Sequence, residues 1–320
     1  MEMFWGLAVS AILLGCTYTL VAIGFSLFFG VMDVVVFCCG DIAIFGSFAI
    51  IGAYAVAQSA GLFGVFPFWV CVILLILIGA VFCAAWGLIT HQLSIKPFQN
   101  SSELMPLLST IAMGTVIKEG LGLLFKPVVN TISAAFDRES AVTVVSGRNP
   151  QGFPSLLLPD GTVGARYLTI IVITAVILLL LFLFLNKTKM GMSMQAISQN
   201  KELSLMTGIN VSRVIIITFL IGGVMLAVSG FLVGSYQKLM SFDDGAMYGA
   251  KGFSAAVVGG LRNTWGAVIG GMLLAFVEVF VSGYIPKGTA YSSIAAFVIV
   301  VIFIVFKPDG IIGDKSVEKV

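Results

Sequence analysis

The chain has 320 residues, of which 59% are hydrophobic and only 10% are charged, and its mean hydropathy is +1.10. No soluble domain of this length is so apolar, so the composition excludes a soluble protein and indicates an integral membrane protein. The formal net charge of +2 excludes the strongly basic footprint of a nucleic-acid-binding protein.

Apolar runs of about 20 residues recur along the chain and are separated by turn residues and charges, which is the pattern of membrane-spanning helices. The alternating segments of a membrane β-barrel are not seen. The sequence therefore predicts an all-α, polytopic integral membrane helix bundle with about 8–10 spans and at least one discontinuous or re-entrant helix. We expect residues 1–320 to form a single transmembrane domain.

The first predicted span covers residues 5–31. No Lys or Arg precedes it and it shows no small-residue cleavage pattern, so we interpret it as a retained span and not as a signal peptide. The five cysteines of the chain lie in apolar surroundings, which is typical of buried side chains and not of a disulfide framework or a metal site. They are Cys16, Cys38, Cys39, Cys71 and Cys83.

The second predicted span, 33–58, contains the unusual sequence VVVFCCGD. Gly40 followed by Asp41 strains a helix, and a carboxylate at membrane depth is costly unless it meets water, a backbone amide or a cation. Irregular backbone inside a bilayer occurs only within protein or beside a water-filled cavity. Asp41 is therefore a candidate for a solute pathway, with a simple position at the membrane edge as the alternative.

Residues 67–90 and 103–125 are the next two predicted spans. The second of them carries the adjacent charges Lys118 and Glu119, which we place near the outer edge of the membrane. Residues 126–166 follow as the longest polar segment, in which the β-branched residues of AVTVVSG suit a short strand. A loop of this length is usually functional. It caps an external vestibule, receives a delivery protein or is a solvated connection.

A second polar interruption, residues 186–213, lies between two long apolar runs. Basic residues outnumber acids in it by four to one, which marks the cytoplasmic side of a membrane. Its interleaved apolar and polar residues predict one or two short amphipathic helices, with Asn200 as an N-cap and Gly208 as the left-handed residue that ends a helix. Such a segment either offers its apolar face to a partner protein or lies on the lipid headgroups.

Predicted spans flank this interruption at 167–185 and 213–236. Small residues four positions apart recur in 213–236 and again in the later span 265–285, and this spacing predicts close helix packing in lipid. The glycines for which the spacing predicts a packing role are Gly230, Gly234, Gly266, Gly270 and Gly271.

Segment 246–262, which contains Lys251, is too short for a full crossing and is predicted to be discontinuous or re-entrant. In transporters, broken helices of this kind build substrate sites. The span 265–285 carries Glu278 in its middle, where a buried carboxylate needs a hydrogen-bonding partner. A last span is predicted at 289–306.

Nothing in the sequence binds nucleotide or performs catalysis. The pattern G-x-x-x-x-G-K-[ST] is absent, so any ATP that drives this protein binds to another chain. No constellation of Ser, His and Asp or of Cys and His is present, and we expect no enzyme activity. With residues 186–213 inside, about nine crossings place the N-terminus outside. The alternatives are a transporter driven by an ion gradient, which would need paired membrane acids or an inverted repeat, and a non-transporting scaffold.

Four stretches carry a family resemblance, in this order along the chain: TYTLVAIGFSLFFGVMDVVVFCCGD, KMGMSMQAISQNKELSLMTGINVSRVIIITF, GAKGFSAAVVGGLRNTWGAVIGGMLLAFVE and FKPDGIIG. The chain resembles the permease subunits of bacterial ABC importers for branched-chain amino acids, in particular the H-type subunit of the leucine-isoleucine-valine system. The resemblance covers almost the whole length.

The resemblance implies that residues 186–213 form a coupling segment that inserts into a cleft of a cytoplasmic ATPase. The signature positions of this segment are occupied by Gly191, Ala196, Gly208, Ile209 and Asn210. The apolar side chains expected to hold it to the ATPase are Met194, Ile197 and Met206. The residues that we then expect along the solute pathway are Cys38, Cys39, Gly40, Asp41, Lys251 and Glu278. The resemblance adds Gly259 and Gly260 to the glycines that we expect to pack helices together.

The resemblance also implies the partners. They are a second, homologous permease subunit in a heterodimer, two cytoplasmic ATP-binding subunits that hold ATP and magnesium, and a periplasmic or lipid-anchored substrate-binding protein. No cofactor is expected on this chain. Its expected location is the bacterial cell inner (cytoplasmic) membrane, where it would cross several times and alternate its pathway between the two sides.

One departure from the family pattern bears on the substrate. Val36, Cys38 and Cys39 stand near Asp41 where the family usually has Asn, Ala and His, so polar groups are lost there. The implied function is import of branched-chain amino acids or a related small polar solute. Import of urea or short amides, which the same family also carries, is the alternative.

Overall fold

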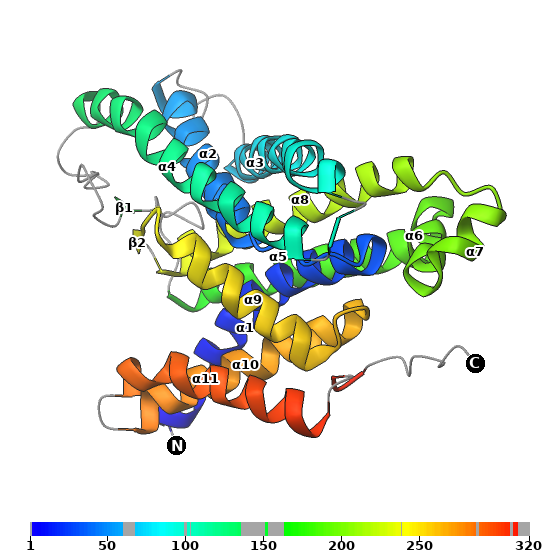
Figure 1. The fold of residues 1–320 in the computed structure, drawn as a ribbon. Coiled ribbons are helices and arrows are strands. Elements are labelled where there is room, and N and C mark those ends of the chain that lie inside the picture. The colour runs from blue at the N-terminus through cyan, green and yellow to red at the C-terminus, as the bar shows by residue number, and fades with distance from the viewer. Residues whose placement is uncertain are drawn as a thin grey trace. The chain divides into compact units, whose positions relative to one another are not determined.

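The computed structural model describes residues 2–59, 68–98, 101–102, 104–135, 151–152, 163–237, 239–285, 288–307 and 310–312. Nearly all of them are helical, which confirms the predicted all-α class (Figure 1). The helices are α1 (Glu2–Met32), α2 (Cys39–Ser59), α3 (Phe68–Thr90), η2 (His91–Ile95), η3 (Lys96–Phe98), α4 (Leu104–Ala135), α5 (Val163–Lys187), α6 (Lys189–Gln199), α7 (Lys201–Met206), α8 (Val211–Gln237), α9 (Asp244–Gly259), α10 (Thr264–Tyr284) and α11 (Gly288–Phe306).

Within the described ranges, six helices are long and apolar enough to cross a membrane: Phe4–Met32, Val72–Phe98, Leu104–Leu123, Leu168–Lys187, Val211–Gly234 and Thr264–Tyr284. Two shorter apolar helices, Cys39–Tyr54 and Ala290–Phe306, accompany them. With 16 residues, α9 is only about 24 Å long against a hydrocarbon layer of about 30 Å, so it agrees with the predicted short segment. The protein is a polytopic helical membrane protein.

The helix α4 is longer than the sequence predicted. It continues to Ala135, whereas the predicted span ended at 125. Pro127 removes one backbone donor but does not end the helix, as happens in kinked membrane helices. Of the expected external loop, residues 136–150 and 153–162, including AVTVVSG, lie outside the described residues. A two-residue strand β1 (Gln151–Gly152) pairs antiparallel with β2 (Leu239–Met240), with Gln151 opposite Met240.

The chain divides into two compact units. The first contains Met1–Val35, Tyr167–Thr218 and Ala250–Val320, and the second contains Val36–Arg166 and Phe219–Gly249. In the first unit α1 packs along α10, α10 packs against α11, and α6 lies against α1 (Figure 1). In the second unit α2 packs against α3 and α4.

Several of the predicted packing glycines lie where two helix backbones approach each other closely. A Cβ atom on Gly271 would lie 2.7 Å from Thr19 Cα, so α10 approaches α1 at this point closer than any side chain allows. Gly259 and Gly266 touch each other's backbones, which brings α9 against α10. Gly230 meets the backbone of α2 in the second unit. Gly270 approaches the Ala255 carbonyl in the same way.

Gly260 forms a turn, a role that was not expected. It follows the last residue of α9 with a φ of 115°, a conformation that side chains rarely adopt, so it forms the turn that redirects the chain toward α10. The helix-packing role expected of Gly260 stays a prediction beside this turn. The packing role of Gly234 stays a prediction.

The predicted burial of the cysteines is confirmed where it is described. Cys16, Cys38, Cys39 and Cys83 are buried free thiols, and the Cys83 thiol donates to the Ile42 carbonyl at 3.2 Å. The side chain of Cys71 lies outside the described residues.

Candidate functional site

The polar segment 186–213 forms two short helices whose ends are fixed by side chains. Thr188 begins α6 by accepting the Gly191 N–H at 3.0 Å, and Asn200 begins α7 by accepting the Leu203 N–H at 3.1 Å. The predicted N-cap at Asn200 is confirmed. Caps of this kind satisfy N–H groups that the first turn of a helix leaves without partners.

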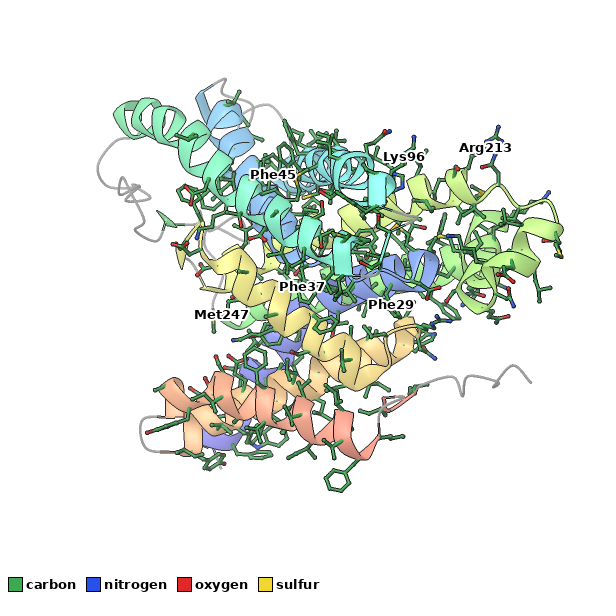
Figure 2. The ribbon with its side chains drawn as sticks, viewed as in Figure 1. Phe29, Phe37, Phe45, Lys96, Arg213 and Met247 are labelled. Atoms are coloured by element: carbon green, nitrogen blue, oxygen red, sulfur yellow. The ribbon has the colours of Figure 1, made fainter. Side chains whose placement is uncertain are left out.

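Gly208 ends α7 as predicted. Its φ is 82°, and its N–H donates to the Leu205 carbonyl at 3.1 Å. The N–H of Ile209 donates to the Ser204 carbonyl at 3.2 Å, which closes the helix end. Asn210 then accepts the Arg213 N–H at 3.1 Å and so caps α8, from whose start Arg213 extends outward (Figure 2).

The apolar residues of this segment divide into a buried and an exposed set. Met194 and Ile197 on α6 are only 2% and 3% exposed and pack within the chain. Their expected role as an exposed grip for a partner is therefore wrong: the apolar face of α6 is used internally. By contrast, Met206 is 84% exposed. Its neighbours Leu203 and Leu205, which belong to the apolar pattern of this segment, are also exposed, and we call these three residues the α7 face.

Gly191 explains how α6 turns back on α5. A Cβ atom there would lie 2.5 Å from Leu185 Cα, so only glycine permits this approach. Ala196 and Ile209 are partly exposed. The segment is thus a capped, backbone-locked unit held against the membrane helices.

A polar link connects this segment to the ends of two membrane helices. In the loop between α9 and α10, Arg262 Nη2 donates to Asp33 Oδ1 at 2.5 Å, and Nη1 donates to the Ser198 carbonyl at 3.3 Å. The guanidinium also lies 5.9 Å from the ring centre of Phe29, near the end of α1 (Figure 2). Sequence reasoning missed this link because Asp33 and Arg262 are 229 positions apart.

Three polar side chains meet inside the first unit, between α1, α9 and α10. Lys251 Nζ donates to Glu278 Oε1 at 2.5 Å and to Tyr18 Oη at 2.9 Å. The Tyr18 hydroxyl donates in turn to Glu278 Oε2 at 2.9 Å. We call these residues the buried triad; Tyr18 and Lys251 are 1% and 6% exposed.

The triad confirms that Glu278 has the partner its position requires. A buried charge is tolerated when it is paired and its remaining hydrogen bonds are satisfied, and here each group bonds to the other two. Tyr18 was missed from the sequence because nothing in its apolar run distinguishes it from a packing residue.

Asp41 is enclosed by protein in the second unit. It lies in the first turn of α2 and is 8% exposed, and Cys38 and Cys39 before it are completely buried. Its role in a solute pathway, with a position at the membrane edge as the alternative, stays a prediction. The N–H of Phe37, which precedes this turn, donates to Thr110 Oγ1 at 3.3 Å (Figure 2).

Glycines make the space that Asp41 occupies. A Cβ atom on Gly245 would lie 2.8 Å from Asp41 Cα, and one on Gly114 would lie 3.3 Å from its carboxyl carbon. Gly40 meets the backbone of Gly249, where a Cβ atom would lie 2.6 Å from Cα. Gly114 and Gly245, the two neighbours of the carboxylate, were not identified from the sequence.

The expected pathway residues therefore fall into two sets. Lys251 and Glu278 are in contact in the first unit, whereas Cys38, Cys39, Gly40 and Asp41 gather at the start of α2 in the second. Lys118, which the sequence placed near the outer membrane edge, forms an ion pair with Asp243 in the second unit.

The apolar helices of the described residues place the chain in the class of polytopic helical membrane proteins. The family described as branched-chain amino acid transport system / permease component matches residues 7–305, and the chain belongs to that family. The predicted family resemblance is confirmed.

Relatives extend over the same length. The high-affinity branched-chain amino acid transport system permease protein LivH of Escherichia coli (strain K12) is 27% identical over 321 residues, which are 97% of this chain and 96% of LivH. BraD of Pseudomonas aeruginosa, with the same description, is 28% identical over 98% of this chain and 96% of its own length. Among solved structures, PsaBC from Streptococcus pneumoniae in complex with Fab covers 94% of this chain and 91% of its own at 13% identity, with a TM-score of 0.49.

Proposed function

We propose that this chain is the membrane permease subunit of a bacterial ABC importer that moves branched-chain amino acids, or a related small polar solute, into the cell. The observation that carries the proposal is the family match over residues 7–305. Relatives named as branched-chain amino acid permeases, aligned over nearly their whole length, support this substrate class over urea or short amides.

The energy comes from partner chains in this proposal. The sequence has no phosphate-binding loop, so ATP and magnesium bind to two separate cytoplasmic subunits. A second, homologous permease subunit completes the membrane part, and a periplasmic or lipid-anchored binding protein delivers the solute. The complex resides in the inner membrane, with the excess of basic residues in 186–213 on the cytoplasmic side.

The α7 face is the proposed contact with the ATP-binding subunits. Its three exposed side chains form an apolar surface on a helix that is capped at both ends. A rigid apolar projection of this kind loses less conformational entropy on binding a partner than a flexible loop does. Because it is rigid, it also transmits a movement of the partner to the helices attached to it.

Movement of the coupling segment would reach the pathway through Arg262. This residue contacts the last turn of α6 and the end of α1, and it stands in the loop that joins α9 to α10. These same helices carry Tyr18, Lys251 and Glu278. A displacement of α6 would thereby shift the helices that hold the buried triad, which is how alternating access would couple to ATP hydrolysis.

A pull-down from mild detergent, with an ATPase assay on the eluate, tests the proposal. The wild-type chain is expected to bring two ATP-binding subunits and a second permease with it. Leu205→Ser combined with Met206→Ser should release the ATP-binding subunits and retain the second permease. The matched control is Leu123→Ser at another exposed apolar position, 74% exposed on α4.

Recovery of an ATP-inert chain without partners would contradict the proposal and favour a gradient-driven transporter. If the complex is recovered, reconstituted uptake of leucine, isoleucine and valine against urea and acetamide identifies the substrate class.

A further inference from the structure

A cleft of about 260 Å³ lies in the first unit beside the coupling segment. Its walls come from α1, from the consecutive helices α5 and α6, and from the start of α10. The proposed pathway uses neither the cleft nor its deeper residues.

The cleft has an apolar and a polar side. Leu27 of α1 and Leu178 and Leu181 of α5 line the apolar side, and Leu27 and Leu181 are buried. The polar side is exposed or partly exposed, and we call it the rim; it is lined by Gln195, Ser198, Arg262 and Asn263. This division matches an amphiphile with a polar head and a hydrocarbon tail, and it does not match a small polar solute.

Ser26 is a second, independent sign of a ligand. It is 2% exposed, lines the cleft, and its Oγ has no hydrogen-bond partner among the described residues. Buried hydroxyls in membrane helices normally bond to their own helix, as Ser47 does to the Ala43 carbonyl at 3.2 Å. A buried hydroxyl without a partner is costly, so an acceptor from a bound molecule is expected at this point.

The rim favours an anionic head. A guanidinium has five N–H donors, and Arg262 uses one for Asp33 and one for the Ser198 carbonyl, so donors remain for a phosphate. Its side chain is 49% exposed and therefore accessible. Asn186, which also lines the cleft, is followed by the exposed Lys187.

The position suits a lipid of the surrounding membrane. Trp265 at the rim is 52% exposed and its ring lies 5.5 Å from that of Phe182 in an edge-on arrangement. Tryptophan in such positions is typical of the membrane interface. On α5, the neighbouring Leu179 and Leu180 are more than half exposed and give that helix an apolar surface beside the cleft.

We propose that this cleft binds one anionic phospholipid, with its phosphate at Arg262 and Asn263, a glycerol ester carbonyl accepting the Ser26 hydroxyl, and an acyl chain along Leu178 and Leu181. Because α6 forms one wall, the bound lipid contacts the coupling segment directly. The lipid would belong to the cytoplasmic leaflet, because the proposed function places residues 186–213 on the cytoplasmic side. This placement rests on the proposed function, whereas the binding of the lipid does not.

Native mass spectrometry of the purified complex after delipidation tests the site. Three probes are added: dioleoyl phosphatidylglycerol, dioleoyl phosphatidylcholine and glycerol 3-phosphate. One phosphatidylglycerol per chain is expected, retained at least tenfold better than phosphatidylcholine, and glycerol 3-phosphate should not be retained. Equal retention of the two lipids would overturn the anionic assignment, and tight binding of glycerol 3-phosphate would identify a free-phosphate site instead.

Two variants fill the cleft from opposite walls, Ser26→Leu on α1 and Leu178→Trp on α5. Each should reduce phosphatidylglycerol retention at least tenfold, and Ser26→Ala, which removes only the hydroxyl, should reduce it severalfold. Ser47→Ala in the second unit is the matched control and should retain the lipid fully. Unchanged retention in both filling variants would overturn the site.

The retention assay requires no transport. A chain that retains phosphatidylglycerol but recruits no ATP-binding subunit would contradict the proposed function alone. A chain that recruits those subunits but retains no lipid would contradict the lipid site alone.

Discussion

Asp33 holds its backbone at a φ of 56° while its carboxylate contacts the Arg262 guanidinium at 2.5 Å. It is the one non-glycine residue with positive φ in the described part of the chain, and this conformation is uncommon for a side chain other than Asn or Asp. The turn at the end of α1 therefore places the Asp33 carboxylate for the ion pair, and the ion pair stabilises the turn. Arg262 contacts α6 at the same place, through the Ser198 carbonyl.

Asp33→Asn should uncouple transport from ATP hydrolysis without unfolding the protein. Asparagine tolerates the left-handed conformation but lacks the charge, and a half-exposed pair contributes only about 0–1 kcal/mol to stability. In proteoliposomes we expect uptake to fall severalfold while ATPase activity persists and the melting temperature stays unchanged. Glu119→Gln, at an exposed acid on α4, is the control. Normal uptake per ATP in the variant would show that this link transmits nothing.

Lys251→Met should destabilise the first unit strongly. It leaves the Glu278 carboxylate buried beside Tyr18 without a cation, and breaking a buried pair from one side costs about 3–5 kcal/mol. Thermal unfolding in detergent is the measurement. The double variant Lys251→Met, Glu278→Gln should recover part of the loss because no uncompensated charge remains. Additive losses in the double variant would mean that the two residues act independently.

Gly208→Pro should abolish ATPase recruitment and leave membrane insertion intact. Proline fixes φ near −65° and has no N–H, whereas Gly208 has a φ of 82° and donates to the Leu205 carbonyl. Gly208→Asn is the matched control, since asparagine tolerates this conformation, and it should retain most of the recruitment. Co-purification of the ATP-binding subunits at wild-type level with the proline variant would argue against α7 as their contact.

Asp41→Asn should reduce uptake by about tenfold or more with little effect on assembly, if a buried charge at the start of α2 serves the pathway. Gly245→Ala should impair folding instead, because its Cβ would lie 2.8 Å from Asp41 Cα. Uptake kinetics and the yield of assembled complex separate the two effects. Glu119→Gln, at an exposed acid on α4, is the control. Unchanged kinetics for Asp41→Asn would assign it a purely structural role.

Local features of this protein could be predicted from the sequence, and contacts across it could not. The Asn200 cap, the left-handed Gly208 and the requirement of Glu278 for a partner each follow from a few neighbouring residues. Tyr18, by contrast, reaches Glu278 across 260 positions, and no periodicity connects them. The same holds for Asp33 with Arg262.

The sequence also could not predict which way the apolar face of an amphipathic helix points. The apolar pattern of 186–213 is compatible with contact to a partner or to the chain itself. Met194 and Ile197 pack within the chain because Gly191 lets α6 fold back tightly on the end of α5, whereas Met206 is exposed. The length of α4 was underestimated for a related reason, since neighbouring structure decides whether a proline such as Pro127 ends a helix.

The burial of the described thiols makes the protein suitable for site-specific labelling. Cys16, Cys38, Cys39 and Cys83 are at most 3% exposed, so water-soluble maleimides will not reach them in the folded state. With Cys71 replaced by Ser, a single cysteine introduced at Met206 would carry a fluorophore or spin label on an 84% exposed position. Such a label would report the movement of the α7 face in real time during the ATP cycle.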